Sequence, residues 1–312
     1  MQGRAASPLD PEFRRSFGAI ARTLGVGTDA VRSRVRRFHE SGFIAGWRTV
    51  VNPNLVGGQE YVITLHVPAS GVERFLDTAR LLPGTFMITR FHGTLVGLIF
   101  REYDERSARR RIELIEKLAG AERAYASRIP FPPCPIVLIR TDRAILQALR
   151  RDPRRRIGDI AKEVGVNART VRRRLERLSR EAAYFALPSL HPRALEGALM
   201  AHVRVEYPAA RKREIDERLA ASLEPQLWHV FHLASHDGGA TAFCIYNLVV
   251  PSVAGGREAL RRAVETPGVT AAWLELYEDF ETLVDAIDEE MDRRLGGPLV
   301  AAESRAVAAR VS

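Results

Sequence analysis

The chain has 312 residues, 46% of them hydrophobic, which is enough for about two to four small domains with cores of their own. Its net charge of +9 favours a polyanionic partner, but all basic residues except Lys117, Lys162 and Lys212 are arginine, as a GC-rich genome also produces. With only Cys134 and Cys244, the composition excludes a disulfide framework and a thiolate zinc site. No apolar run suits a signal peptide or a membrane span, so we expect a cytoplasmic protein without a membrane partner.

The first unit opens with a predicted helix-turn-helix. Residues 17–26 (FGAIARTLGV) are expected to form a short helix and a turn, and the next helix begins near Thr28, whose side chain can cap it. Val31, Val35 and Phe38 have the spacing of a face that packs on a core. The outward positions of this helix are Asp29, Arg32, Ser33 and Arg36.

An extended segment at residues 42–51 is expected to form a wing, the small strand pair that flanks a recognition helix. Strands and helices then alternate, with a strand at 61–67, a helix at 70–82, strands at 86–91 and 94–100, a helix at 106–119 and a strand at 121–128. This β-α-β-β-α-β order is typical of a ferredoxin-like sandwich, in which helices cover one face of an antiparallel sheet. Residues 129–136 (IPFPPCPI) follow as a proline-dense bridge that suits a semi-rigid spacer.

The second unit begins with a complete three-helix pattern. Residues 141–150 place three apolar side chains on one helical face, whereas residues 1–11 have no such face, so the first unit has an incomplete first helix. The second helix covers 157–164 and ends at Gly165, and Asn167 can cap the third. This third helix turns inward Val171, Leu175 and Leu178, and outward Arg169, Arg172, Arg173 and Glu176.

A second wing segment at 182–187 precedes a second β-α-β-β-α-β series. Its elements are predicted at 200–207, 210–223, 227–233, 240–247, 252–266 and 269–277. A final helix at 278–295 and a disordered tail from Gly296 complete the chain. Each sheet leaves one face uncovered, so two such sheets in one chain could cover each other as a built-in dimer.

The two units repeat each other at an offset of 140 positions. Matching pairs include Ile20 and Ile160, Gly25 and Gly165, Val31 and Val171, Arg32 and Arg172, and Phe91-His92 and Phe231-His232. A period this long exceeds any solenoid repeat, so we interpret the chain as a tandem copy of a multi-domain module.

Residues 17–38 and 157–178, followed by the β-α-β-β-α-β series, resemble the Lrp/AsnC family of transcriptional regulators, here in a tandem single-chain form. The resemblance implies an α+β fold of two winged helix-turn-helix domains, each followed by a ferredoxin-like βαββαβ domain of the RAM type. The domains are expected at 1–58 (winged helix-turn-helix), 59–130 (αβ), 131–140 (linker), 141–198 (winged helix-turn-helix), 199–280 (αβ) and 281–312 (C-terminal helix and tail). Operator DNA, a small-molecule effector and further copies of the chain are the partners that it implies.

Both recognition helices carry arginines that can bind guanine edges or phosphates. The residues expected to meet DNA are Thr28, Arg32, Ser33 and Arg36 in the first unit and Asn167, Arg169, Thr170, Arg172 and Arg173 in the second. Residues 168–181 hold six arginines against two glutamates, while residues 28–41 hold four arginines against two acidic residues. The second unit should therefore bind DNA more strongly.

The histidines suggest a small-molecule site in the αβ domains. The residues placed there are His92, His232, His236 and Asp237, before a turn at Gly238-Gly239. His229 and His232 point to opposite faces of one strand, so neither a shared metal ion nor a cofactor is expected. The acidic residue that the family usually has three positions after a turn glycine is replaced by Val96 after Gly93, so a free amino acid is not expected to be the best ligand.

No carboxylate pair, nucleophile motif or phosphate loop stands out, so we expect a regulator rather than an enzyme. The alternative is a tetrapyrrole enzyme of the siroheme decarboxylase type, because those proteins are similar to the Lrp/AsnC family in both domains and use histidines near a tetrapyrrole. A third possibility is a sensor protein that does not bind DNA, and its support is the incomplete first helix of the first unit.

Overall fold

The computed structural model describes residues 16–55, 57–235 and 240–296. The predicted effector residues His236 and Asp237, the Gly238-Gly239 turn, residues 1–11 and the tail beyond Gly296 lie outside these ranges. Among the helices that the described residues form, none combines the length and the apolar character that crossing a bilayer requires.

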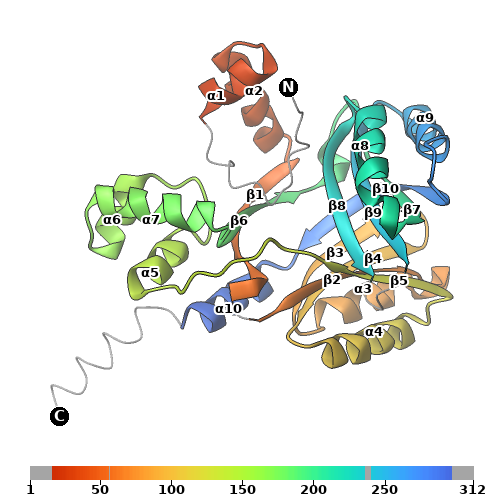
Figure 1. Cartoon of the computed structure of the whole chain (residues 1–312), viewed down its shortest axis with the longest axis horizontal. Coiled ribbons are helices and arrows are strands. Elements are labelled where there is room, and N and C mark those ends of the chain that lie inside the picture. Colours follow the sequence, from red (N-terminus) through yellow and green to blue (C-terminus); the bar gives the residue numbers. More distant parts are fainter. Residues whose placement is uncertain (1–15, 56, 236–239, 297–312) are drawn as a thin grey trace.

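Two four-stranded antiparallel sheets join along both edges into one closed barrel, with the strand order β10-β3-β4-β2-β5-β8-β9-β7 (Figure 1). The first sheet contains β2 (Gln59–His66), β3 (Thr85–Phe91), β4 (Leu95–Glu102) and β5 (Arg123–Ile129). The second contains β7 (Leu199–Pro208), β8 (Leu227–Ser235), β9 (Thr241–Val250) and β10 (Ala271–Thr282). Each half is a ferredoxin-like βαββαβ domain, as the sequence pattern predicted.

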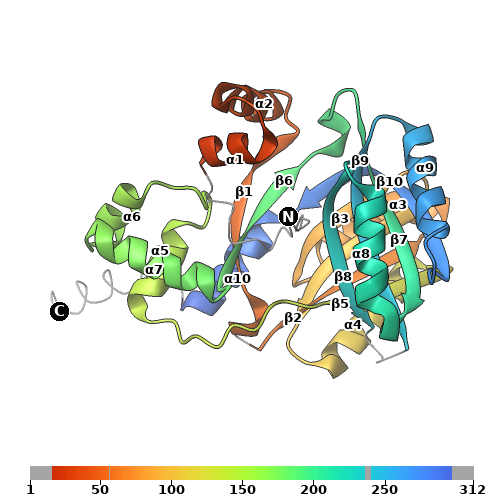
Figure 2. The same ribbon diagram turned by 45° about the horizontal axis from the view of Figure 1, so that its top comes forward.

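Helices cover the outside of the barrel (Figures 1 and 2). They are α3 (Val72–Arg80) and α4 (Glu105–Ala119) on the first sheet, and α8 (Lys212–Leu223) and α9 (Val253–Val264) on the second. The alternation of side chains along each strand explains this arrangement: Ile63 and Leu65 of β2 are buried against α3 and α4, while Val62 and Thr64 line the barrel interior. The inner faces of the two sheets thus cover each other, as expected, and their edges also pair.

Strand β10 joins the two sheets. It pairs with β7 of its own sheet over 271–276 and with β3 of the other sheet over 277–282. The prediction of a helix from residue 278 is therefore wrong for 278–282, because the ladder with β3 uses the backbone groups of this segment. The last helix, α10, runs from Val284 to Leu295.

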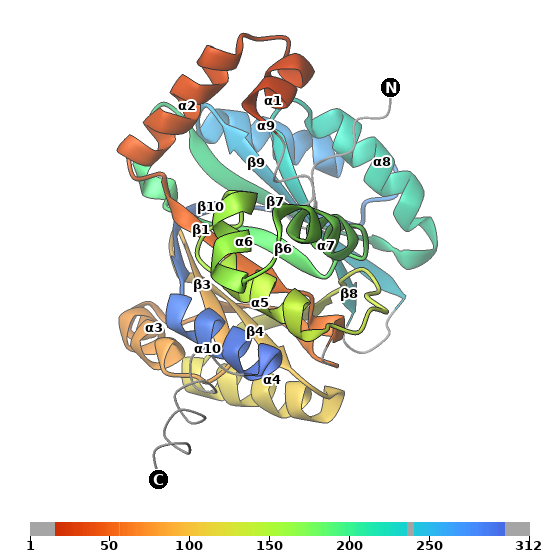
Figure 3. The ribbon, with the colours of Figure 1, turned by 90° about the vertical axis from the view of Figure 1, so that its left-hand side faces the viewer.

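Both helix-turn-helix units lie outside the barrel (Figures 1 and 3). The first contains α1 (Phe17–Leu24) and α2 (Thr28–Glu40), and the second contains α5 (Arg140–Ala148), α6 (Ile157–Val164) and α7 (Ala168–Arg180). They are connected by a two-stranded ribbon of β1 (Ile44–Val51) and β6 (Tyr184–Leu190). The sequence predicted a wing within each unit. Instead, each unit supplies one strand, and the two strands pair with each other, which gives their backbone groups partners.

Two features fix the second unit and the linker in place. The Asn52 side chain is fully buried, and its amide donates hydrogen bonds to the carbonyls of Pro132 and Ala182, each at 2.9 Å. Helix α10 packs Met291 into the core of the second unit, and its Glu290 accepts a hydrogen bond of 2.8 Å from Tyr103, which directly follows β4. α10 therefore connects the second helix-turn-helix unit to the barrel.

Candidate nucleic-acid interface and barrel interior

Helix α7 has the architecture that the sequence predicted. Asn167 caps it, since its Oδ1 accepts a hydrogen bond of 2.7 Å from the Thr170 backbone N–H. Val171, Leu175 and Leu178 are buried in one core with α5 and α6. The preceding turn contains Gly165 at φ 71°, a left-handed conformation that favours glycine.

The outward face of α7 presents free cations. Arg169, Arg172 and Arg173 are exposed, and in the part of the chain that the structure describes none of them forms an ion pair. Arg174 points inward instead, with its guanidinium 3.7 Å from the buried carboxylate of Asp142 on α5. The helix therefore separates three arginines that are available to a partner from one that stabilises the unit.

The first unit is built less completely. The prediction that Thr28 caps α2 is wrong, because Gly27 occupies the cap position and Thr28 is the first helical residue. Phe38 was expected to face a core but is 37% exposed, since residues 16–55 contain no counterpart of α5 that could cover it. Val31 is buried and Val35 is half-buried.

Two exposed arginines of α2, Arg32 and Arg36, are engaged within their own helix, whereas Arg34 and Arg37 are exposed without an ion pair among the described residues. Arg32 donates a hydrogen bond of 2.9 Å to Asp29, and Arg36 lies 3.6 Å from Glu40. Ser33 is half-buried. The two units thus differ not only in net charge but also in how many of their arginines are free.

The structure does not bring His92 and His232 together. His92 is exposed at the β3–β4 turn, where its backbone N–H donates to Leu276 of β10. His232 lies on β8, the strand that pairs with β5 at the opposite seam of the barrel. Its Nδ1 is 3.2 Å from a carboxylate oxygen of Asp216 on α8. The hydrogen bond to Asp216, together with the neighbouring Cys244, raises the pKa of His232 to about 9.

The barrel interior is asymmetric. The first sheet lines it mainly with apolar groups such as Val62 and Ile99, whereas the second sheet contributes His202 and Asn247. The Tyr277 hydroxyl donates to Asn247 Oδ1 and lies 2.9 Å from His202 Nδ1. Burial, with a smaller effect of the nearby Arg204 charge, lowers the pKa of His202 to about 3. His202 is therefore neutral near pH 7.

This interior holds a small cavity. Its volume is about 90 Å³, and its lining includes His202, Trp228, Asn247 and Tyr277. The Asn247 side chain is 1% exposed, and its Nδ2 has no hydrogen-bond partner among the described residues. A buried amide donor in this state is a group that a ligand could satisfy.

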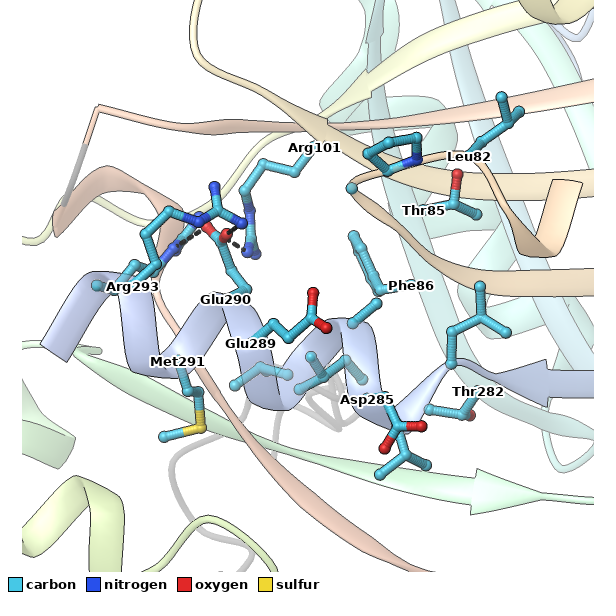
Figure 4. Close-up of a pocket in the computed structure, with 18 of the residues that line it drawn as sticks. Leu82, Thr85, Phe86, Arg101, Thr282, Asp285, Glu289, Glu290, Met291 and Arg293 are labelled. Atoms are coloured by element: carbon cyan, nitrogen blue, oxygen red, sulfur yellow. Dashed lines mark hydrogen bonds and ion pairs between the residues drawn. The ribbon is translucent and has the colours of Figure 1, made fainter. Parts of the chain in front are cut away.

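A second cavity, of about 950 Å³, lies where α10 meets the barrel (Figure 4). Glu290 lines it and pairs with Arg101, Arg293 and Arg294. Burial acts to raise the pKa of Glu290, but the charge of Arg294, a hydrogen bond from Tyr103 and the charge of Arg101 hold it below the usual range. Because these charged groups already pair with one another, we assign them a role in docking α10.

Comparisons with known proteins agree with this architecture. Residues 140–179 match the model of the AsnC-type helix-turn-helix domain. The HTH-type transcriptional regulator Ptr1 of Methanocaldococcus jannaschii is 36% identical over 75 residues, a match that covers 24% of this chain and 51% of Ptr1. The chain thus spans about half the length of this curated relative.

Among solved structures, the chain is similar to the siroheme decarboxylase NirDL, with a TM-score of 0.55 and 10% identity. The alignment covers 90% of this chain and 92% of NirDL. NirDL in complex with an iron-uroporphyrin III analogue gives a TM-score of 0.54 at the same identity and coverage. At this identity the likeness concerns the fold alone.

Proposed function

Because residues 140–179 form an AsnC-type helix-turn-helix domain and relate the chain to the Lrp/AsnC regulators, we propose that this protein is a transcriptional regulator that binds operator DNA mainly through its second unit. The observation that carries the proposal is the outward face of α7, where Arg169, Arg172 and Arg173 are exposed and unpaired within the described residues. Arginines at the exposed start of such a helix can bind guanine O6 and N7, and those further along meet phosphates.

The first unit contributes less in this proposal. To bind phosphate, Arg32 would have to break its ion pair with Asp29, and Arg36 its ion pair with Glu40. The two carboxylates would then remain beside the DNA. The β1–β6 ribbon joins the two units, so both can approach one duplex from a single chain. Four further residues are assigned to contacts with the DNA backbone beside the arginines: Thr28, Ser33, Asn167 and Thr170.

Salt titration tests DNA binding. The protein would be titrated into a labelled duplex from the region upstream of its own gene, and anisotropy would be measured from low to high salt. About six phosphate contacts predict a log–log slope of about −5. No binding at low salt, or a slope near zero, would refute the proposal.

We assign the small-molecule response to the αβ barrel. The buried Asn247 amide supports this, and the cavity of about 90 Å³ has the volume of roughly three waters, so an effector of a few heavy atoms fits without repacking. A route to DNA is available, because β10 leads from the barrel into α10, which packs on the second unit. A thermal-shift screen of small neutral and anionic metabolites against free amino acids tests this. The matched variant is Asn247→Ile, because Ile99 lies at the equivalent position of the first sheet. A metabolite that raises the melting temperature of this variant as much as that of the unchanged protein would refute this location.

The siroheme decarboxylase fold makes a tetrapyrrole enzyme the second candidate, since the likeness extends over 90% of the chain. The barrel interior is too small for a tetrapyrrole, because the ring of Phe91 stacks on that of Tyr277 with 4.9 Å between the ring centroids and the remaining space is about 90 Å³. Pockets for drug-sized ligands have ~300–1,000 Å³. The cavity of about 950 Å³ at α10 has that size, but the paired charges around Glu290 line it. Adding an iron tetrapyrrole and recording its Soret band separates the two. A saturable shift at one equivalent per chain would favour the enzyme.

A further inference from the structure

A dense polar cluster lies beneath α8, on the outer side of the second sheet. It consists of Tyr207, Lys212, Asp216, His232, Cys244 and Tyr246. Cys244 is fully buried, whereas the side chains of Asp216 and His232 are 14% and 52% exposed. Only His232 was predicted as a site residue from the sequence, because its neighbours come from other elements, α8, β7 and β9.

The first half of the chain shows that the fold does not need this cluster. Strand pairing aligns Cys244 with Val96 and Tyr246 with Leu98, because Cys244 faces Val205 as Val96 faces Leu65. Five residues of the cluster have apolar counterparts in the first half: Val67 for Tyr207, Val72 for Lys212, Leu76 for Asp216, Val96 for Cys244 and Leu98 for Tyr246. All five are buried in one hydrophobic core. Buried ionic groups are often no more stabilising than apolar residues of similar size, so the second half has a reason other than folding to keep them.

Three of the side chains present metal-ligand atoms at suitable separations. His232 Nδ1 lies 3.2 Å from Asp216 Oδ2 and 3.4 Å from Cys244 Sγ, and Sγ lies 3.5 Å from Asp216 Oδ1. Tetrahedral zinc, with bonds of ~2.0–2.3 Å, places neighbouring ligand atoms ~3.3–3.6 Å apart. The two distances from His232 Nδ1 therefore match those between neighbouring ligands of tetrahedral zinc, and one ligand atom from each of the three residues lies within 4.8 Å of the other two.

The Lys212 ammonium lies against all three of these side chains. Its Nζ lies 2.9 Å from Cys244 Sγ, 3.0 Å from Asp216 Oδ2 and 3.3 Å from His232 Nδ1. A cation thus already stands where the ligands converge. The Lys212 side chain is 33% exposed and flexible, so it can move into solvent when a cation of higher charge arrives.

The two tyrosines orient the carboxylate. The hydroxyls of Tyr207 and Tyr246 both donate to Asp216 Oδ1, the latter at 2.8 Å. Oδ2 is thereby left to face His232 and Lys212. Outer hydrogen bonds of this kind hold a metal ligand in its binding geometry.

We propose that Asp216, His232 and Cys244 form a binding site for a divalent transition-metal ion such as Zn²⁺, and that the ion displaces the Lys212 ammonium. Thiolate, imidazole and carboxylate are ligands that zinc accepts, and three protein ligands leave a fourth position for water. The proposal does not depend on DNA binding. A site of this kind revises two expectations from the sequence: that two cysteines are too few for a thiolate zinc site, and that His232, with His229 on the opposite face of its strand, has no partner for a metal ion.

A catalytic Cys–His–Asp triad fits the geometry less well. In a triad the histidine uses one ring nitrogen for the nucleophile and the other for the carboxylate. Here the same atom, Nδ1 of His232, faces both Cys244 and Asp216. Cys244 is also 0% exposed, so a substrate carbonyl could not reach its sulfur.

Cobalt substitution tests the site. Co²⁺ would be titrated into the purified full-length protein without an affinity tag, and the visible d–d bands and the thiolate-to-cobalt charge-transfer band would be recorded. We expect one ion per chain and bleaching by one equivalent of Zn²⁺. Cys244→Val, which introduces the residue found at the equivalent Val96, should abolish the charge-transfer band. His232→Ala should weaken Co²⁺ binding by at least about tenfold.

Two further variants keep the test decisive if a ligand substitution impairs folding. His92→Ala, at the position that matches His232 in the 140-residue sequence repeat, should leave binding unchanged. Lys212→Met removes the competing ammonium and should tighten Co²⁺ binding. The proposal is overturned by an absent cobalt spectrum, by a charge-transfer band that persists in Cys244→Val and disappears in Cys134→Ser, or by weaker binding in Lys212→Met.

Discussion

The two recognition helices should contribute unequally to DNA binding, and paired double variants measure the difference. Arg172→Ala with Arg173→Ala removes two exposed guanidinium groups that have no ion pair in the described structure. Arg32→Ala with Arg36→Ala removes two that already face Asp29 and Glu40. Both double variants delete the same formal charge, so a difference between them reports local geometry.

The expected magnitudes follow from the pairing. Each lost phosphate contact lowers the slope of log K against log salt by about 0.9, so the variant of the second unit should lose about 1.8. If one of the two arginines reads a base, it costs ~1–3 kcal/mol and relaxes one operator position. Exposed pairs such as Arg32–Asp29 are worth ~0.2–1 kcal/mol. The variant of the first unit should therefore lose no more than about 1 kcal/mol of binding free energy, which is about fivefold in Kd.

The assay is fluorescence anisotropy with one operator duplex at several salt concentrations. Arg213→Ala on α8 controls for the loss of one positive charge, because this exposed arginine pairs with Glu217 of its own helix, outside both helix-turn-helix units. Circular dichroism would establish that all variants fold. Equal losses in the two double variants, or a larger loss in the first unit, would refute the asymmetry.

Three further outcomes concern stability. Burial holds His202 neutral in the folded protein, whereas the histidine of the unfolded chain takes up a proton below about pH 6.5, so the free energy of unfolding should fall progressively from about pH 6.5 to about pH 3, by ~2 kcal/mol at pH 5. His202→Val, which introduces the residue type of Val62, should make the free energy of unfolding in urea less dependent on pH in this range. An unchanged pH dependence contradicts the assignment. Asn167→Ala should cost ~1 kcal/mol through the lost cap, and a thermal melt that does not shift speaks against it. Leu178→Ala should lower the free energy of unfolding by ~2–5 kcal/mol, and Phe38→Ala at the matching position should lower it clearly less, because Leu178 is fully buried and Phe38 is 37% exposed. Similar losses of unfolding free energy in chemical denaturation would mean that Phe38 belongs to a core.

The local pattern of the sequence was sufficient for most of the elements. Helical spacing placed Val171, Leu175 and Leu178 in a core, and the short polar side chain of Asn167 predicted a cap, which is confirmed. The cap at Thr28 failed because the residue that matches Asn167 at the 140-residue offset is Gly27. The strand at 278–282 was missed because its partner, β3, belongs to the other half of the chain.

The sequence by itself determined the order of helices and strands, because 3.6-residue and two-residue periodicities are local, and it located the arginines of the recognition helices. Only the tertiary structure decided which of these arginines are free and that β1 and β6 pair across the two units. It also decided that Lys212 and Asp216 of α8 meet His232 and Cys244. Contacts of this kind depend on how the chain packs over long sequence separations, and no periodicity within one segment records them.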